Sequence, residues 1–357
     1  MSARTLWVKI LQNRMETGEP YLMFEDAVQA DLPNFQQRKG LQVNHSNLCS
    51  EITLATNDER TAVCSLSSVN LEYYDEWEKV PAFIPDLIRM LDNVLESFIQ
   101  NAPQQLERAK FSAMRERSLG LGAMGFHAYL QKNMIPFESP MASAINYEMF
   151  DSIKSQAQNT TEQLAVERGA CPDDDSCSVR NTHLLAIAPN ASSSIICGNT
   201  SPSIEPFRAN AYTQKTKSGS YLQKNKFLEE LLEKYEQNTE STWKSIVTNK
   251  GSVQHLEFLS EEEKEVFKTA VEINQSWVIE HAAQRQEFIC QSQSVNLFFP
   301  PDVNKGELHN IHMLAWAKNM KTLYYLRSEA ISRADNVSNK IKREIIFEQQ
   351  DCLSCEG

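Results

Sequence analysis

The chain has 357 residues, of which 41% are apolar and 23% charged, a composition typical of globular proteins and not of long disordered segments. Its formal net charge of −12 disfavours a broad nucleic-acid-binding surface, which would need a basic face. It contains no apolar run of about 18 residues and no secretory leader at its start, so we expect a cytoplasmic protein without a membrane partner.

The pattern of apolar residues predicts alternating helices and strands. In chain order we expect a helix over 4–17, a strand over 21–24, a tight loop entering a strand over 47–54, a strand over 64–71, helices over 84–101 and 141–168, a strand over 184–188, mostly helix over 226–285, and strands over 295–299 and 322–326. Such alternation predicts a parallel sheet or barrel of the α/β class. Apolar periodicity fades after about residue 328, which predicts a mobile tail.

A glycine-rich run at 120–125 matches the G-x-G-x-x-G pattern of dinucleotide-binding loops. That interpretation needs a strand before the run, whereas residues 111–118 are charged and helix-prone. We therefore reject a dinucleotide site and expect a helix or turn that packs closely against the sheet.

Asn47, Cys49 and Glu51 alternate along the chain. In an extended segment, residues two apart point to the same side, so an amide, a thiol and a carboxylate would face one site. There the carboxylate could accept a proton from a substrate hydroxyl while the sulfur acts on the adjacent carbon. A lone cysteine is more often a core residue. Cys64, 15 residues further on, is equally consistent with a buried thiol in a strand.

Cys352 and Cys355 form a C-x-x-C pair near the end of the chain. This spacing suits a dithiol that cycles to a disulfide, because the second sulfur can resolve a mixed disulfide formed by the first. A structural zinc site would need two further ligands, and no second close cysteine pair lies nearby. A redox dithiol is the better interpretation, with zinc as the alternative.

Two further patterns each allow two interpretations. Tyr324 and Tyr325 lie in a strand-like run, where adjacent side chains normally face opposite sides; they could also support stepwise oxidation through neighbouring phenols. The turn at 189–194 offers consecutive hydroxyls and N–H groups after a strand. If a helix follows, it forms a phosphate cradle, and otherwise it is a capping turn.

Combined, these motifs resemble the large subunit of class I ribonucleotide reductases. The resemblance runs through 16–22, 46–52, 64–71, 117–122, 189–194, 201–206, 291–297, 321–325 and the C-x-x-C tail. It implies that residues 1–330 form the C-terminal half of a ten-stranded α/β barrel, with a loop that carries a radical cysteine, and that residues 331–357 form a flexible redox tail.

The resemblance also implies roles for single residues. Cys49 would form the thiyl radical that abstracts hydrogen from the ribose, Glu51 would take the 3′-hydroxyl proton, Asn47 would hydrogen-bond the substrate, and Cys64 would be one of the two reducing cysteines. The remaining roles are radical transfer by Tyr324 and Tyr325, re-reduction by Cys352 and Cys355, and binding of a ribonucleoside diphosphate by Ser46, Ala191, Ser192, Ser193 and Ser194. No metal or cofactor is expected in this chain, which would depend on a metal and radical cofactor in a small subunit.

The sequence departs from the family in one respect: a full-length large subunit carries several hundred residues before the first motif matched here. They include the first half of the barrel and the second reducing cysteine. We expect a separate chain to supply them, a small subunit to supply the radical, and a thioredoxin- or glutaredoxin-like protein to reduce the tail. The alternatives are an inactive fragment or assembly scaffold, a zinc-binding structural domain, and a glycyl-radical or cobalamin-dependent reductase of the same superfamily.

Overall fold

The computed structural model describes residues 1–216 and 219–328, including the side chains outside 214–220. Its helices are α1 (Ala3–Thr17), α2 (Glu25–Ala30), α3 (Asn34–Arg38), α4 (Tyr74–Trp77), α5 (Phe83–Asn101), α6 (Glu107–Glu116), α7 (Phe126–Lys132), α8 (Pro140–Arg168), α9 (Ala191–Ile196), α10 (Lys226–Lys234), α11 (Glu240–Thr248), α12 (Glu261–Val266), α13 (Gln275–Gln286) and α14 (Lys305–Ala317), with 3₁₀ turns at Leu71–Tyr73 and Gln104–Leu106. None of the described helices is long and apolar enough to cross a membrane.

Parallel strands form the centre of the molecule. β2 (Ser65–Asn70) pairs in parallel with β3 (Leu119–Met124), and single parallel bridges then join Leu121 to Leu185 and Ile187 to Gln293. β6 (Leu297–Phe299) pairs in parallel with β8 (Leu326–Ser328), while β1 (Leu22–Met23) pairs antiparallel with β7 (Thr322–Leu323). Within the described residues these strands form a wall that does not close into a complete barrel.

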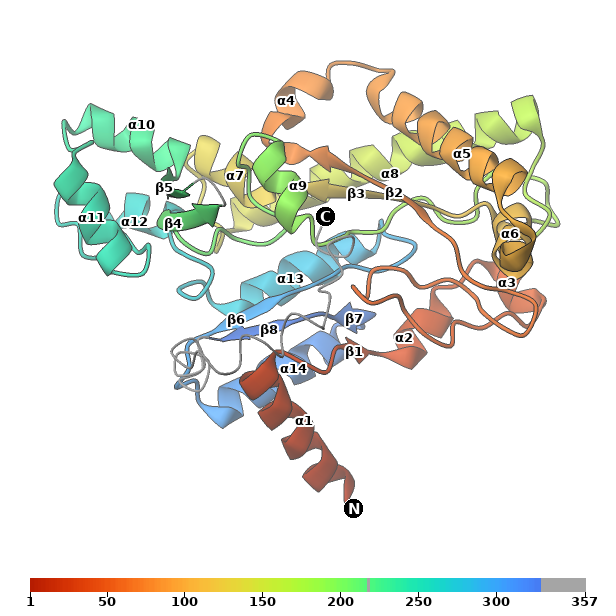
Figure 1. The fold of residues 1–357 in the computed structure, drawn as a ribbon, viewed down its shortest axis with the longest axis horizontal. Coiled ribbons are helices and arrows are strands. Elements are labelled where there is room, and N and C mark those ends of the chain that lie inside the picture. The colour runs from red at the N-terminus through yellow and green to blue at the C-terminus, as the bar shows by residue number, and fades with distance from the viewer. Residues whose placement is uncertain (217–218, 329–357) are drawn as a thin grey trace.

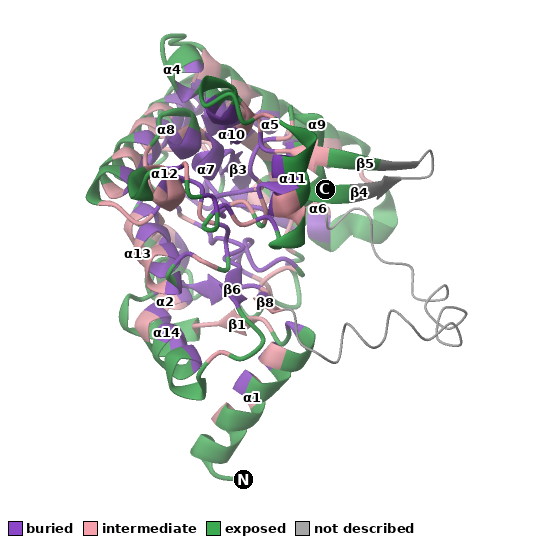
Figure 2. Ribbon diagram, turned by 90° about the vertical axis from the view of Figure 1, so that its left-hand side faces the viewer, coloured by how far each residue is buried: buried purple, intermediate pink, exposed green. Residues whose placement is uncertain are grey.

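Helices cover the outer side of this wall (Figure 1). α5 packs against β2, β3 and α8, and α13 packs against α8 and α14. The strands β3, β6 and β7 are buried, whereas the outward faces of the helices are exposed (Figure 2). A second, smaller apolar core lies between α10, α11 and α12, beside the hairpin of β4 (Ala211–Thr216) and β5 (Gly219–Lys224).

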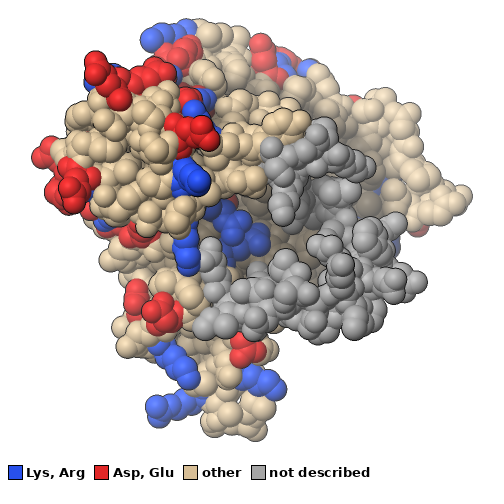
Figure 3. All heavy atoms as spheres, turned by 60° about the vertical axis from the view of Figure 1, so that its left-hand side comes forward, with Lys and Arg blue, Asp and Glu red and all other residues tan. Residues whose placement is uncertain are grey.

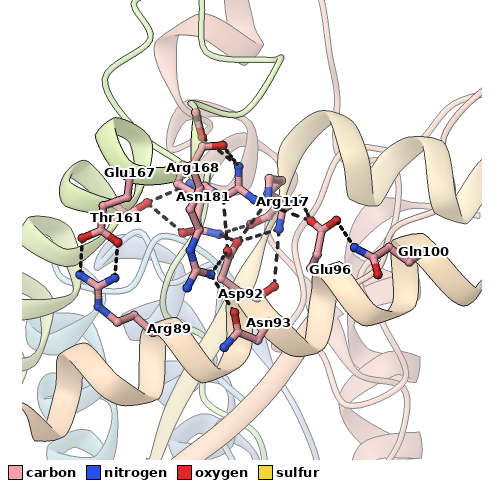
Figure 4. A network of polar contacts seen from close by, with 12 residues as sticks. Arg89, Asp92, Asn93, Glu96, Gln100, Arg117, Thr161, Glu167, Arg168 and Asn181 are labelled. Atoms are coloured by element: carbon pink, nitrogen blue, oxygen red, sulfur yellow. Dashed lines mark hydrogen bonds and ion pairs between the residues drawn. The ribbon is translucent and has the colours of Figure 1, made fainter.

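A buried ionic network fixes the packing of these helices on the wall (Figure 4). Asp92 of α5 is fully buried and accepts from Arg117 before β3 (2.9 Å), Arg168 at the end of α8 (3.0 Å) and Arg180 (3.2 Å). Burial raises the pKa of Asp92, but the nearby Arg117 and Arg180 outweigh it and hold the pKa below its ordinary value. The Asp92 carboxylate therefore holds α5 to the end of α8 and to the two segments that carry Arg117 and Arg180.

The structure corrects the prediction for the glycine-rich run, which forms the buried strand β3 and not a helix or turn. A Cβ atom on Gly120 would lie 2.4 Å from Leu66 Cδ2, and one on Gly122 would lie 2.6 Å from the Ala186 carbonyl oxygen. The glycines are needed because neighbouring strands approach this closely.

Other predicted elements are present with different limits. The helices expected at 4–17, 84–101 and 141–168 are confirmed as α1, α5 and α8, and the helical stretch over 226–285 is divided into α10 to α13. The predicted strand at 184–188 is reduced to single bridges, and the one at 322–326 is divided into β7 and β8 around the two tyrosines.

Candidate active site

A tight turn carries Cys49. The Ser50 N–H donates to the Asn47 carbonyl (3.1 Å), and the Ile52 N–H donates to Asn47 Oδ1 (3.1 Å). Ser50 has a φ of 71°, so the chain reverses here. The tight loop predicted over 47–54 is therefore confirmed, but it enters no strand, and the extended geometry considered for residues 47–51 is wrong. Asn47 and Glu51 still converge, because the turn returns Glu51 to the Asn47 side chain, which hydrogen-bonds it.

Ser294 holds both functional groups of this turn. Its hydroxyl donates to the Cys49 carbonyl oxygen (2.5 Å) and to Glu51 Oε2 (3.2 Å). Cys49 and Glu51 are only 5% and 2% exposed. Burial raises the pKa of the Glu51 carboxyl, against the hydrogen bonds from Asn47, its own backbone and Ser294. A carboxylate with a raised pKa is suited to accept a proton near neutral pH.

The Cys49 thiol contacts the first of the two adjacent tyrosines. Tyr324 Oη donates to Cys49 Sγ over 3.6 Å, and the Tyr324 and Tyr325 ring centroids lie 4.4 Å apart. Burial, followed by the contact with Cys49, raises the pKa of Tyr324, so this phenol keeps its proton at neutral pH. Of the two interpretations left open for this pair, the one in which the rings face opposite sides of a strand does not hold, because the residues lie between β7 and β8 and not inside one strand.

Tyr21 extends this pair to a cluster of three phenols. Its ring centroid lies 4.5 Å from that of Tyr324 and 4.8 Å from that of Tyr325. Tyr21 lies in the strand predicted over 21–24, and the sequence assigns it no functional role. Only the antiparallel pairing of β1 with β7 brings it here, and a single sequence contains no signal for that pairing.

Arg14 of α1 fixes the backbone around the cluster. It is fully buried and donates to the carbonyl oxygens of Tyr324 (3.0 Å) and Pro20 and to His312 Nε2 (3.1 Å). Burial lowers the pKa of this guanidinium to about 10, so it remains charged at neutral pH. One side chain thus connects the segments that carry Tyr21 and Tyr324.

Cys64 lies at the start of β2 and is partly buried. Gln291 Nε2 donates to Cys64 Sγ (3.1 Å) and to the Leu119 carbonyl oxygen (2.9 Å). A Cβ atom on Gly120 would lie 2.9 Å from the same sulfur. The glycine therefore leaves room for the thiol, and burial raises its pKa above the ordinary value for cysteine.

The predicted substrate residues line two separate cavities. Ser46, Asn47 and Cys64 line one of about 710 Å³, and Ala191 and Ser194 line a larger one of about 1020 Å³. Ser192 is exposed and Ser193 half-buried, and neither lines the larger cavity. The Ser194 hydroxyl donates to the Ala191 carbonyl oxygen (3.0 Å), so it is engaged within α9.

Positive charge gathers around the larger cavity. Its lining includes five basic residues, namely Arg208, Lys224, Lys226, Lys250 and Arg327, against the two acidic residues Glu205 and Glu272. Figure 3 shows Lys and Arg side chains gathered in a hollow on one face of the molecule. The sequence left open whether a helix follows the 189–194 turn; in the structure the serines lie inside the helix α9, whose N-cap residue Asn190 makes no side-chain capping hydrogen bond. Despite the net negative charge of the chain, this cavity can attract an anion.

Arg327 joins this cavity to the tyrosines, because its guanidinium lies 3.9 Å from the centroid of the Tyr325 ring. Asn296 accepts from the Tyr325 N–H (3.1 Å) and donates to Glu205 (2.7 Å). The phenol cluster therefore borders the cationic cavity, with the Cys49 thiol behind it.

Comparison with known proteins identifies the family to which this arrangement belongs. The family model "Ribonucleotide reductase, barrel domain" matches residues 1–177 and 175–326. The chain belongs to the ribonucleotide reductase family. It is 48% identical to the ribonucleoside-diphosphate reductase large subunit of Invertebrate iridescent virus 3 and 46% identical to a putative one of Frog virus 3 (isolate Goorha), over 100% of this chain in both cases.

A solved ribonucleotide reductase has the same fold. The class Id alpha subunit of Actinobacillus ureae is 42% identical and superposes with a TM-score of 0.87 over 92% of this chain. The predicted fold class, part of the α/β barrel of ribonucleotide reductases, is thereby confirmed. This chain spans 57% and 63% of the two viral large subunits and 61% of the solved alpha subunit.

Several residues of this reductase site were not predicted from the sequence. Ser294, Gln291, Arg14 and Tyr21 position the predicted groups, although the first two lie in a motif that the family resemblance had already marked. The tail dithiol of Cys352 and Cys355, and with it the proposed boundary at residue 330, lies outside the described residues.

Proposed function

We propose that this chain forms the C-terminal part of a catalytic site that reduces ribonucleoside diphosphates to deoxyribonucleotides by thiyl-radical chemistry. The observation that carries the proposal is the 3.6 Å contact between Tyr324 Oη and Cys49 Sγ, with the Tyr325 ring next in line. A tyrosyl radical at Tyr324 can take the hydrogen atom of the Cys49 thiol, so that an O–H bond forms and the S–H bond breaks.

The remaining groups account for the later steps. The Cys49 thiyl radical takes the hydrogen from the ribose 3′ carbon, and Glu51 accepts the 3′-hydroxyl proton while the 2′ hydroxyl, protonated by one of the two reducing cysteines, leaves as water. Cys64 and a second cysteine supply two electrons and become a disulfide. The hydrogen taken from the 3′ carbon is then returned to it by Cys49. Burial of the radical thiol protects it from solvent during these steps.

The cationic cavity is the proposed site for the substrate diphosphate. The basic side chains of its lining favour an anion there, although Lys224 and Lys226 are also paired with Glu229 and Glu72, and Ser46 and Asn47 would contact the sugar from the smaller cavity. We expect a ribonucleoside diphosphate to bind at least about tenfold more tightly than the unphosphorylated nucleoside. Equal affinity in a calorimetric titration would contradict this placement.

Three partners follow from the proposal. The relatives are longer than this chain, so the rest of a large subunit must supply the second reducing cysteine and complete the wall. A small subunit supplies the radical through its own metal cofactor. A thioredoxin- or glutaredoxin-like protein reduces Cys352 and Cys355, which in turn reduce the active-site disulfide.

The test is reconstitution of this chain with the missing part of a large subunit, a small subunit and a dithiol reductant. Cys49→Ser should abolish deoxyribonucleotide formation, and Tyr324→Phe should reduce it by at least about a hundredfold without unfolding the chain. The matched control is Cys171→Ser, since Cys171 is also a buried thiol, at 1% exposure, and its backbone pairs with Val179 and Asp174. Absence of turnover by the unsubstituted assembly would favour an inactive fragment.

The tail is tested in the same assembly. Cys352→Ser together with Cys355→Ser should abolish turnover driven by a thioredoxin-like protein but preserve a single turnover of the pre-reduced enzyme. Loss of the single turnover, or bound zinc that disappears with the substitutions, would contradict a redox role for this pair.

A further inference from the structure

Cys290 follows α13 and precedes Gln291, whose side chain donates to Cys64 Sγ at the proposed site. Its sulfur accepts the backbone N–H groups of Leu184 (3.0 Å) and Leu185 (3.3 Å). An S–H group here would have the Leu185 carbonyl oxygen at 3.7 Å as its acceptor. Two donors directed at the sulfur, against one distant acceptor, favour the thiolate over the thiol.

The charged and titratable groups around Cys290 come from four segments. Lys154 on α8 and His183 act directly on the thiol, the buried Lys321 ahead of β7 interacts with it, and Cys64 interacts with it from the start of β2. Burial raises the pKa of the Cys290 thiol, but Lys154, His183 and the Leu184 N–H outweigh it and lower the pKa to about 5. By contrast, burial raises the pKa of Cys171 to about 11.

His183 is positioned to pair with this sulfur. The residue is 1% exposed, and its Nε2 atom lies 3.3 Å from Gln36 Oε1. Gln36 donates in turn to the buried Glu116 (3.3 Å), which also accepts from Ser112 (2.7 Å). The amide of Gln36 is thereby oriented with its oxygen toward His183, so Nε2 must donate. The other ring nitrogen, Nδ1, is buried and has no hydrogen-bond partner among the described residues, and His183 as a whole lowers the pKa of the Cys290 thiol.

We propose that Cys290 is a reactive thiolate, supported by His183, and a modification site for small electrophiles, including hydroperoxides. The thiolate attacks one peroxide oxygen, so an S–O bond forms and the O–O bond breaks. The sulfur loses two electrons to become a sulfenic acid, and hydrogen peroxide is reduced to water. Cys290 is half-buried, which permits access by small reagents. The inference is independent of the proposed function, because it requires no turnover.

The first experiment follows alkylation of Cys290 by iodoacetamide in the intact chain, using mass spectrometry between pH 6 and pH 8.5. The rate constant should change by less than about twofold over this range, because a thiol with a pKa near 5 is already ionised at pH 6. A model thiol with a pKa of about 8.5 should change by roughly a hundredfold over the same range. A hundredfold rise at Cys290 would overturn the proposal.

Two variants test whether the flat pH profile of Cys290 depends on His183 and Lys154, and not only on the accessibility of the sulfur. His183→Leu should restore a steep pH dependence, and Lys154→Gln, on a half-exposed residue, should do so in part without a risk to folding. Hydrogen peroxide at pH 6.5 should produce a dimedone adduct at Cys290 that Cys290→Ser abolishes. If peroxide leaves Cys290 unlabelled, or if both variants keep the flat profile, the thiolate assignment is wrong.

Discussion

Gly120 shows how one residue of β3 makes room for a proposed catalytic thiol. Replacing it with alanine would place a Cβ atom 2.4 Å from Leu66 Cδ2 and 2.9 Å from Cys64 Sγ. We expect Gly120→Ala to lower the free energy of unfolding by about 1–3 kcal/mol, since overpacking forces neighbouring groups to shift. Urea denaturation provides the measurement.

The control for this substitution is Gly306→Ala, at the start of α14, where a Cβ atom meets only the Asn304 side chain at 3.1 Å. That change should alter the free energy of unfolding by less than about 1 kcal/mol, because alanine also favours the helix. Equal effects at the two glycines would contradict the argument from close packing at Cys64.

Glu205 should make the free energy of unfolding of this chain depend on pH. Burial raises its pKa to about 7, against the Asn296 hydrogen bond and the charges of Arg208 and Arg327. A carboxyl whose folded-state pKa lies above its unfolded value stabilises the fold most at low pH, and this contribution is lost as the pH rises from about 4.5 to 7.

Glu205→Gln removes this titration and keeps an acceptor for Asn296. Relative to the unsubstituted chain, the variant should gain about 2 kcal/mol more stability at pH 8 than at pH 5, as measured by urea unfolding at both values. A gain that is the same at both values would show that Glu205 does not titrate in this range.

Two sets of ion pairs on α5, one buried at Asp92 and one exposed at Arg89, should contribute very differently to the stability of the fold. Asp92→Asn leaves Arg117, Arg168 and Arg180 without their shared carboxylate in a buried site, which should cost about 3–5 kcal/mol of stability. Glu167→Gln breaks the exposed pair with Arg89 (2.6 Å) and should cost less than about 1 kcal/mol. Thermal unfolding of both variants tests the contrast, and similar losses would refute it.

How far the sequence predicts the elements depends on whether the signal is local. The helix of 84–101 is recovered as α5, because an apolar stripe repeated over many turns identifies its buried face. The strand β3 was missed because its glycines have low strand propensity and are required by neighbouring backbone, which a local pattern does not reveal. The tight loop that carries Cys49 was predicted, but the groups that hold it were not, since Ser294 and Ser292 lie more than 240 residues away.

Local sequence patterns also fail to predict the contacts that orient the candidate active site around Cys49. The family resemblance identified Cys49, Glu51, Tyr324 and Cys64, and the structure brings the first three together around Ser294 and the thiol–phenol contact. The groups that orient them, Arg14 and Gln291, act through hydrogen bonds between segments that are far apart in the chain. Such pairings follow from the tertiary fold and not from residue spacing.

For the whole chain, the unpaired edge of β2 predicts where the additional part of a large subunit, as proposed above, would add. Within residues 1–216 and 219–328, β2 pairs with β3 alone, and Leu66 on it is 43% exposed. Open strand edges and exposed apolar side chains favour pairing with another strand. A strand added here would also lie beside Cys64, at the start of β2, where the second reducing cysteine is required.

Hydrogen exchange measures this directly. When the missing part of the large subunit is added, backbone amides of 65–70 that face away from β3 should exchange at least about tenfold more slowly, because strand pairing protects them. Amides of β3 already lie between β2 and the segment around Leu185, so they should change by less than about twofold. Under oxidising conditions the same assembly should form a disulfide between Cys64 and the added polypeptide, which Cys64→Ser prevents and Cys171→Ser does not. Protection elsewhere with β2 unchanged would mean that the two parts meet at another surface, and the site proposed around Cys49 would then lack its second reducing cysteine.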